Sequence, residues 1–500
     1  MFRNLNLFLK KNKKIITNNK NKKIVLIADR QRFDPSIRSS LIAKIFNNKG
    51  YNPVVISNKL NSDFIEIYKS FGISNFLNTS ILSNKFFFLK NFFLFTFLSI
   101  FNLIKFHFLG IEKFKFNFKI NDVLIGSQIC DQYFKNKDKF KKGILTLDFL
   151  RILLLAYIKI NIIQNFIKKN NVKHSVVSTD CYLNESSILF HLSKKLRIKC
   201  IVTVRQMIKL YSKKKDFEKH VYEIKLEDIP KNIKISNFNK HAESRFEGKI
   251  DHPDVIKAFR QKKNIYNQKS FESFFNINPK KYKKIILFAP HVFSDCCHTD
   301  GPFPFLNYYN FFTETIDEIN KIKDIFWIIK PHPARHLWDE DNLIKDYLQN
   351  KLQKNMCICP DYISTKSLLQ YVDTIVTGRG TIAIECAVFG KRPLTCGGSY
   401  YSEVGFVKAT KNKKEFFNSL KFKNYKFILS NNLKIKAKKS LYFQGHLKWE
   451  QDSKILPVMF TKDFKSLNKY FNHINKQLKK FSFLKDNFYL TTKKKIEKKI

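Results

Sequence analysis

Basic, histidine and hydroxyl side chains follow two short apolar runs in the second half of the chain. The first run, Phe326–Ile329, is followed by KPHP, and the second run, Thr374–Thr377, is followed by GRGT. Each run is typical of a buried parallel strand. Ligands of open α/β sheets bind beyond the carboxyl ends of the strands, so both clusters are expected to face one cleft. Their side chains suit a phosphorylated ligand.

His332 is the first candidate phosphate ligand. Pro331 and Pro333 flank it, restrict its backbone and remove two amide donors. We expect an extended His332 at a strand end, with its ring donating to a phosphate. Lys330 lies two residues earlier on the same strand face and could add positive charge. The alternative is a histidine that only satisfies local packing.

The GRGT segment predicts a helix that begins near Thr381 and places its first amides toward an anion. Gly380 and Thr381 are therefore candidate donor-binding residues. Glu385 lies one turn after Thr381 on the same helical face and could accept both hydroxyls of a ribose. The alternative is a displaced capping box with Glu385 facing solvent. Ser399 and Tyr400 follow the next strand and are expected to line the exit of the site, with simple packing as the alternative for the tyrosine.

The loop HVFSDCCHTD follows a third strand and contains candidates for a general base. His291 and Asp295 are the first choices, and His298 and Asp300 are alternates. Their density also raises the question of a metal site, but their spacing matches no metal-binding motif. We therefore assign no metal ligands and expect no cofactor.

The alternation of strands and helices predicts an α/β protein, and 500 residues suit two domains. Each domain is expected to be Rossmann-like. The expected divisions are a basic N-terminal tail (1–22), a first Rossmann-like acceptor domain (23–210), a connecting segment (211–280), a second Rossmann-like nucleotide-sugar-binding domain (281–420) and a Lys-rich helical C-terminal segment (421–500).

The formal net charge of +51 raises the question of a nucleic-acid partner. The lysines are scattered along the whole chain, and no zinc-finger spacing or RNP-type strand is visible, so no nucleic acid is expected. Nine scattered cysteines without CxxC spacing indicate a reducing cytosol. The stretch Met1–Lys23 is basic but lacks the features of a secretory signal.

The stretch Phe86–Ile104 is dense in phenylalanine and leucine. Lys90 and Asn91 divide it and leave Phe92–Ile104, which as a helix spans roughly 20 Å. A bilayer core needs about 30 Å, so no transmembrane span is expected. A buried helix is the first expectation. An interfacial helix with flanking lysines on an anionic membrane surface is the second.

Six stretches together resemble the capsular-polysaccharide and surface-carbohydrate glycosyltransferases, which have a GT-B-like fold and are relatives of the bacterial β-Kdo transferases. The four stronger and two weaker stretches are HVFSD (His291–Asp295), WIIKPHP (Trp327–Pro333), TGRGTIAIECAVFGKRPL (Thr377–Leu394), GGSYYSEVGF (Gly397–Phe406), VLIGSQICDQYF (Val123–Phe134) and STDCYLNESSILFHLSKK (Ser178–Lys195).

This resemblance implies two Rossmann-like domains whose parallel sheets face each other across a cleft. It implies transfer of a sugar from a nucleotide-activated donor, with a CMP-sugar favoured and UDP- or CDP-linked donors left open, to a growing or lipid-linked glycan. His332 and Pro333 would contact the donor phosphate, and Glu385 would contact the ribose. The base would be Asp295 or an acidic residue of the first domain.

The acceptor is expected on the first domain, where Tyr182, Asn184 and Glu185 begin a helix after a strand. Direct displacement without a metal is expected, since fixed positive groups would hold the leaving phosphate. The protein is expected in the cytoplasm, peripheral on the inner face of the membrane. A nucleotide-sugar epimerase and a non-catalytic component of a capsule assembly complex remain alternatives.

Overall fold

The computed structural model describes residues 23–140, 144–178, 181–204, 207–218, 223–229, 233–250, 253–260, 262–297, 303–445, 455, 476–477 and 481–498. The chain forms two compact units. Unit 1 comprises Met1–Tyr133, Lys142–Val221 and Leu447–Ile500. Unit 2 comprises Phe134–Lys141 and Tyr222–His446. The expected tail 1–22 lies outside the described residues.

Unit 1 is built on a six-stranded sheet in the order β3-β2-β1-β6-β7-β8. All neighbouring strands are parallel except β7 and β8, which are antiparallel. From β1 the chain continues to β2 and β3 on one side of the sheet, and from β6 it continues to β7 and β8 on the other side. The topological switch point therefore lies between β1 and β6. The strands are β1 (Ile24–Ala28), β2 (Asn52–Ser57), β3 (Asn75–Asn78), β6 (Val172–Val177), β7 (Lys199–Val204) and β8 (Met207–Tyr211).

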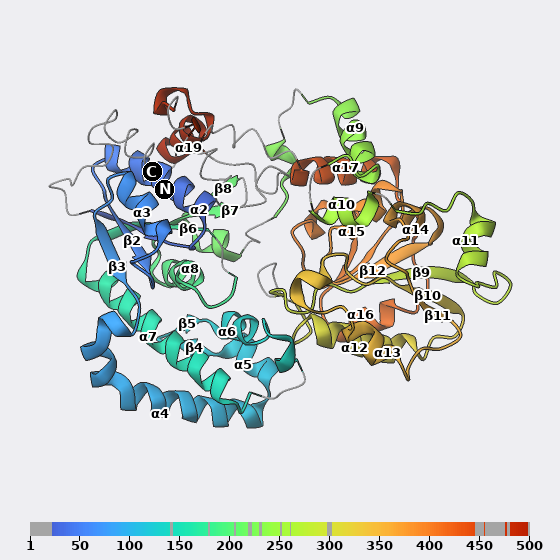
Figure 1. Ribbon diagram of the computed structural model, residues 1–500, viewed down its shortest axis with the longest axis horizontal. Helices are drawn as coiled ribbons and strands as arrows, with labels where there is room; N and C mark the ends of the chain where they lie inside the picture. The colour runs from blue at the N-terminus through green and yellow to red at the C-terminus, as the bar shows by residue number, and fades with distance from the viewer. Residues whose placement is uncertain are drawn as a thin grey trace. The chain divides into compact units, whose positions relative to one another are not determined.

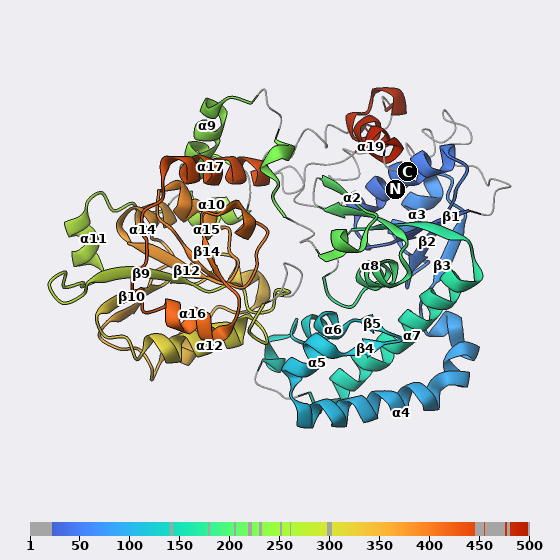
Figure 2. The same ribbon diagram turned by 180° about the vertical axis from the view of Figure 1, so that it is seen from behind.

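Helices cover both faces of the first sheet, and α4 lies along the side of α7 that faces away from the sheet (Figure 1). The view from behind shows the same order of α4, α7 and α8 (Figure 2). A small antiparallel ribbon, β4 (Lys119–Ile120) with β5 (Val123–Leu124), stands apart from the main sheet. The helices are α2 (Phe33–Asn48), α3 (Asp63–Ser70), α4 (Lys85–Leu109), α5 (Ile111–Asn117), α6 (Gly126–Tyr133), α7 (Leu147–Lys169), α8 (Glu185–Leu196) and α19 (Asn487–Glu497).

Unit 2 contains a second six-stranded sheet, all parallel, in the order β11-β10-β9-β12-β13-β14. Its central strands are continuous apolar runs because helices bury both faces. The switch point lies between β9 and β12. The strands are β9 (Lys284–Ala289), β10 (Ile325–Ile329), β11 (Met356–Ile358), β12 (Thr374–Thr377), β13 (Leu394–Cys396) and β14 (Lys408–Thr410).

One face of the second sheet is covered by α12, α13 and α16, and the other by α14, α15, α10 and α17 (Figure 1). The segment α17 packs against both α15 and α9, so residues 431–445 belong to unit 2. The helices are α9 (Ile235–Phe246), α10 (Pro253–Phe259), α11 (Gln268–Phe274), α12 (Tyr308–Ile319), α13 (Leu343–Leu348), α14 (Thr365–Tyr371), α15 (Ile382–Val388), α16 (Lys413–Ser419) and α17 (Asn431–Gly445).

The predicted fold class is confirmed: the protein is α/β, with two Rossmann-like sheets, the first parallel except for its edge strand β8 and the second all parallel. The segment expected to connect the domains, 211–280, instead contains three helices, α9 to α11, that belong to unit 2. The expected C-terminal segment, 421–500, is divided, since α17 belongs to unit 2 and α19 packs on α2 of unit 1. The stretch that begins at Val123, one of the two weaker stretches of the resemblance, lies in the small ribbon and not in the main sheet.

The expectation of a short buried helix in the phenylalanine-rich stretch is wrong. Helix α4 runs unbroken for 25 residues, and most of its large apolar side chains are exposed. Lys90 and Asn91 interrupt the hydropathy but not the helix, because neither residue breaks an α-helix. By length and composition, two helical stretches of the described chain could cross a membrane, Leu82–Leu109 and Leu147–Lys169.

Candidate functional site

The carboxyl ends of β9, β10 and β12 lie side by side in unit 2. Thr377, the last residue of β12, donates its hydroxyl to the Ala289 carbonyl at the end of β9 (2.8 Å). On the other side of β9, the Lys330 amide donates to the Phe288 carbonyl (2.9 Å). The three loops predicted to carry the chemistry therefore leave neighbouring strands at the switch point of this sheet.

Three rings form a stack above these strand ends. The His291 ring lies between Tyr308 (centroids 4.3 Å apart, planes at 14°) and His332 (5.5 Å, 26°). Tyr308 in turn lies against Gly378, where an added Cβ would be 3.2 Å from its ring carbon Cε1. Ring stacking joins the HVFSD and KPHP loops, and the close approach of Tyr308 to Gly378 adds the GRGT loop, all within unit 2.

His332 has a defined local geometry. Its Nδ1 accepts a hydrogen bond from the Ala334 amide (3.1 Å). A neutral imidazole whose Nδ1 is an acceptor carries its proton on Nε2, so His332 is oriented as an Nε2–H donor. Pro333 lies between the two residues and contributes the fixed backbone angle that brings the Ala334 amide back to the ring.

The candidate bases His291 and Asp295 lie in a loop that a buried carboxylate secures. The distance from His291 Nδ1 to Asp295 Oδ2 is 3.9 Å, within reach of an ion pair but too long for a hydrogen bond. Glu340 accepts hydrogen bonds from the Phe293 amide, the Ser294 amide (both 2.8 Å) and the Ser294 hydroxyl (2.6 Å).

Burial raises the pKa of Glu340, although these three hydrogen bonds and the nearby His291 act in the opposite direction. Glu340 was not predicted from the sequence, and its position 46 residues after Ser294 gives no local signal. The alternates His298 and Asp300 lie outside the described residues. Within the described ranges, no group of three or more His, Cys, Asp or Glu side chains is arranged to hold a metal ion.

Lys330 is buried, and its ammonium donates to the Ile363 carbonyl in the loop after β11 (3.5 Å). Burial lowers the pKa of Lys330, while the nearby Cys359 and Asp361 act to raise it. The ammonium is thus directed to the β11 side of the edge. Arg379 is also buried and ties the GRGT loop to the HVFSD loop by donating to the Cys297 carbonyl (2.6 Å).

Thr381, Tyr400 and Gln444 form a polar triangle beside the start of α15. The hydroxyls of Thr381 and Tyr400 are 3.1 Å apart, and the Gln444 amide donates to both, at 3.0 and 2.9 Å. The Thr381 side chain does not cap α15, so the capping-box alternative is wrong. Gln444 comes from α17, and no sequence signal pointed to it.

Gly380 and Ser399 shape the same corner of the site. A Cβ at Gly380 would be 3.1 Å from the Thr377 hydroxyl, so the loop has no room for a larger residue without adjustment. The Tyr401 hydroxyl donates to the Gly380 carbonyl (2.9 Å). Ser399 is buried, and its hydroxyl and amide both contact the Ser402 hydroxyl (2.8 Å each).

Glu385 faces the interior of unit 2, not solvent. Its Oε1 accepts hydrogen bonds from both Nε (2.8 Å) and Nη2 (2.6 Å) of Arg245 on α9. The Arg245 and Glu385 side chains are only 12% and 6% exposed. Among the described residues, none donates a hydrogen bond to Oε2. The Oε2 atom can therefore accept a hydrogen bond from a ligand.

A cavity of about 540 Å³ also lies in unit 2, but four aspartates line it together with Phe140 and Tyr309. Carboxylates repel phosphate, so this cavity does not suit a nucleotide-linked donor. Its aspartates are Asp138, Asp339, Asp341 and Asp346.

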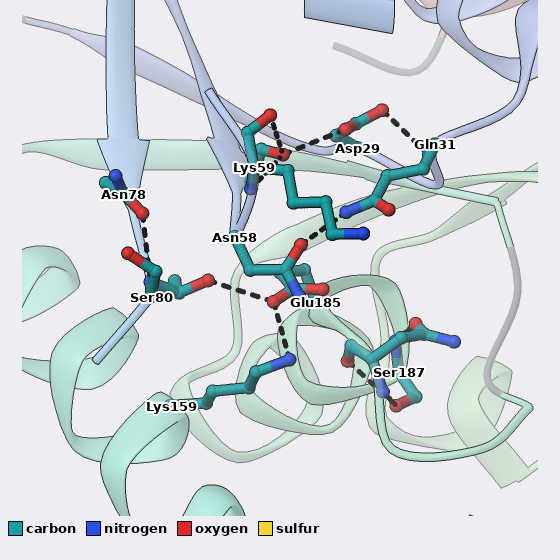
Figure 3. Close-up of polar contacts among 12 residues, drawn as sticks. Asp29, Gln31, Asn58, Lys59, Asn78, Ser80, Lys159, Glu185 and Ser187 are labelled. Atoms are coloured by element: carbon teal, nitrogen blue, oxygen red, sulfur yellow. Dashed lines mark hydrogen bonds and ion pairs between the residues drawn. The ribbon is translucent and has the colours of Figure 1, made fainter. Parts of the chain in front are cut away.

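The carboxyl edge of the first sheet holds a second polar cluster, in which Glu185 points toward Lys159 and Asp29 toward Gln31 (Figure 3). Glu185 accepts from Lys159 (2.8 Å) and from the Thr79 hydroxyl (2.9 Å). Asp29 follows β1 and accepts from the Gln31 amide (3.0 Å) and the Ser57 hydroxyl (2.9 Å). Burial raises the pKa of Asp29, and the charge of Glu185 adds to this effect.

The predicted acceptor residues have clear structural roles in unit 1. Asn184 caps α8 by accepting from the Ser187 amide (3.0 Å), and Ser187 completes a capping box. The Ser187 hydroxyl also donates to the carbonyl of Tyr182, a residue with a positive φ of 55°. Of the three predicted residues, only Glu185 joins the polar cluster at the sheet edge.

A model of the family described as "Capsule polysaccharide biosynthesis protein" matches residues 197–446. Among solved structures, the chain is similar to the Thermosulfurimonas dismutans KpsC beta Kdo 2,4 transferase, at 12% identity over 54% of this chain and 79% of that chain, with a TM-score of 0.32. It is similar to a glycosyltransferase from Rickettsia africae ESF-5, at 12% identity over 96% and 100%, with a TM-score of 0.27.

A third similar structure is the UDP-GlcNAc 2-epimerase of Methanocaldococcus jannaschii, at 11% identity over 85% of this chain and 100% of that chain, with a TM-score of 0.27. A comparison with curated proteins gave no match.

Proposed function

The chain belongs to the capsule polysaccharide biosynthesis protein family, and from this premise we propose that it is a glycosyltransferase. It transfers a sugar from a nucleotide-activated donor to a growing surface or capsular polysaccharide or to a lipid-linked glycan. The family match to residues 197–446 carries the proposal, since it includes His332, Thr381, Glu385 and Tyr400 of the unit 2 edge.

The donor binds at the carboxyl edge of the second sheet, and a CMP-sugar is the favoured donor. His332 donates from Nε2 to the phosphate, which the tautomer set by Ala334 supports. Glu385 accepts the ribose hydroxyls through Oε2. The hydroxyls of Thr381 and Tyr400, already oriented by Gln444, provide further hydrogen bonds to the donor.

The reaction is direct displacement of the nucleotide by an acceptor hydroxyl. His291 or Asp295 takes the proton of that hydroxyl, and the anomeric carbon gains the new C–O bond as its bond to the phosphate oxygen breaks. His332 and the buried charge of Lys330 stabilise the departing phosphate without a metal ion. Stacking between Tyr308 and His332 restricts His291 to one ring orientation, which supports a positioned base.

The acceptor binds at the polar edge of unit 1 that Asp29 and Glu185 form. We place the reaction in the cytoplasm, where a nucleotide-sugar would be available. Nine free cysteines support a reducing compartment.

The test is nucleotide release by the full chain, measured with CMP-, CDP-, UDP- and GDP-sugars in the presence and absence of a lipid-linked glycan. We expect one donor to be consumed only when the acceptor is present. Consumption without acceptor would favour an epimerase, and binding without turnover would favour a non-catalytic assembly component.

A further inference from the structure

Helix α4 presents an apolar stripe to solvent along its whole length. Eight of the ten large exposed apolar side chains of α4 recur mostly three or four residues apart, which places them on one face of the helix; the other two are Leu94 and Leu109. At the middle of the stripe, Phe93 is 84% exposed and Phe97 is 64% exposed, and at its ends Phe86 and Phe108 are 91% and 82% exposed. The stripe is Phe86, Leu89, Phe93, Phe97, Ile100, Phe101, Ile104 and Phe108.

The opposite face of α4 is attached to unit 1. Phe95, Leu103 and Phe106 are buried, and Phe95 stacks on Tyr157 of α7 at 5.8 Å. The Asn102 side chain donates to the Tyr157 hydroxyl (3.1 Å). Because α4 packs against α7 along one face, the stripe is part of the folded surface of unit 1.

The charged side chains of α4 itself are all basic. From Lys85 to Leu109 the helix contains three lysines and neither Asp nor Glu. Lys85, Lys90 and Lys105 are all exposed. Long lysine side chains can extend from the edge of an apolar face and reach anionic headgroups. Apolar residues flanked by cations are the pattern of helices that lie in a membrane interface.

We propose that the exposed face of α4 docks unit 1 onto an anionic phospholipid bilayer, with the helix lying in the plane of the interface. As a straight helix α4 is about 38 Å long, enough to cross a bilayer core. A span would require α4 to leave α7 and expose Phe95, Leu103 and Phe106, or α7 to leave α8 together with it. The interfacial arrangement keeps these contacts and removes only the exposed stripe from water.

This docking is independent of the donor chemistry proposed above. Docking would hold a glycan-synthesising chain at the surface where lipid-linked acceptors are found. If the vesicle experiment fails, the transferase proposal still stands, because the donor site lies in unit 2.

The test is co-sedimentation of the full chain with phosphatidylcholine vesicles that contain or lack phosphatidylglycerol. The wild type should bind the anionic vesicles, and added salt should weaken the binding. Phe93→Glu should lower the partition coefficient about tenfold or more. Tyr266→Glu is the matched control, since Tyr266 is also an aromatic that is 84% exposed but lies in unit 2, and it should change binding less than twofold.

Insertion is measured with Phe93→Trp, whose emission should shift to the blue with anionic vesicles, while that of Tyr266→Trp should not. An alkaline carbonate wash should release the bound protein. Equal binding of Phe93→Glu and wild type would overturn the proposal, as would resistance to the wash, which indicates a span. The proposal would also be overturned if the wild type did not bind vesicles but formed a dimer that Phe93→Glu dissociates. That result would show that a second copy of the chain covers the stripe.

Discussion

The ion pair between Glu385 and Arg245 permits a test that separates a structural role of Glu385 from a ligand-binding one. Both side chains are almost fully buried, and both hydrogen bonds from the guanidinium end on Oε1. Removing one partner of such a pair leaves an uncompensated buried charge, which costs about 3–5 kcal/mol. We expect Glu385→Gln, which keeps the shape but removes the charge, to lower the free energy of unfolding by about 3 kcal/mol.

The same substitution should weaken nucleotide binding if Oε2 accepts the ribose hydroxyls. A hydrogen bond to a charged group contributes about 1.5–3 kcal/mol, so the dissociation constant should rise about 10- to 150-fold. The control is Arg245→Lys, which retains a cation near Oε1 but loses the two-nitrogen contact. It should be less stable than wild type yet bind nucleotide within about threefold of wild type.

The assays are urea denaturation for stability and isothermal titration calorimetry with CMP for affinity. In the double variant, the loss of stability should be smaller than the sum of the two single losses, because the two residues interact directly. Equal losses of affinity in Glu385→Gln and Arg245→Lys would refute a ribose contact and leave the pair with a structural role alone. Additive stability losses would refute the buried-pair reasoning itself.

Two further predictions concern positions away from the donor contacts. Glu340→Ala should leave the amides of Phe293 and Ser294 without their acceptor and raise their hydrogen-exchange rates, whereas unchanged exchange would contradict the role of Glu340 in securing the loop. Burial lowers the pKa of His174 to about 4, below its ordinary value near 6.5, so its neutral form is favoured in the fold. Between pH 6.5 and 4 the unfolded state therefore binds a proton at His174 that the folded state does not. The free energy of unfolding should be highest above pH 6.5 and fall by up to about 3 kcal/mol as the pH falls toward 4. His174→Phe should flatten the loss of melting temperature over this range, and parallel curves for variant and wild type would contradict it.

The central strands of the second sheet could be predicted because buried parallel strands are local apolar runs in the sequence. The run Thr374–Thr377 was predicted as a strand with the bounds that β12 has. A helix was also expected to begin at Tyr182, Asn184 and Glu185, and α8 begins at Glu185 with a capping box formed by nearby residues. Such features depend on neighbours in sequence, so local patterns determine them.

The exposure of α4 and the partners of the site residues could not be predicted in this way. Hydropathy shows that α4 is apolar but not that α7 covers only one of its faces. Arg245 lies 140 residues before Glu385, in the segment 211–280 that was expected to connect the two domains. Gln444 lies 63 residues after Thr381. These contacts depend on how α9 and α17 pack onto α15, and no local pattern encodes that packing.

The donor site at His332 is the central claim, and nucleotide binding by two variants tests it most directly. His332→Asn retains an acceptor for the Ala334 amide but loses the donor at the Nε2 position, while His332→Gln can place an amide donor near that position. We predict that CMP, or one of CDP, UDP and GDP, raises the melting temperature of the wild type, that His332→Asn loses this stabilisation, and that His332→Gln retains part of it. Stabilisation of His332→Asn equal to that of the wild type would contradict the assignment.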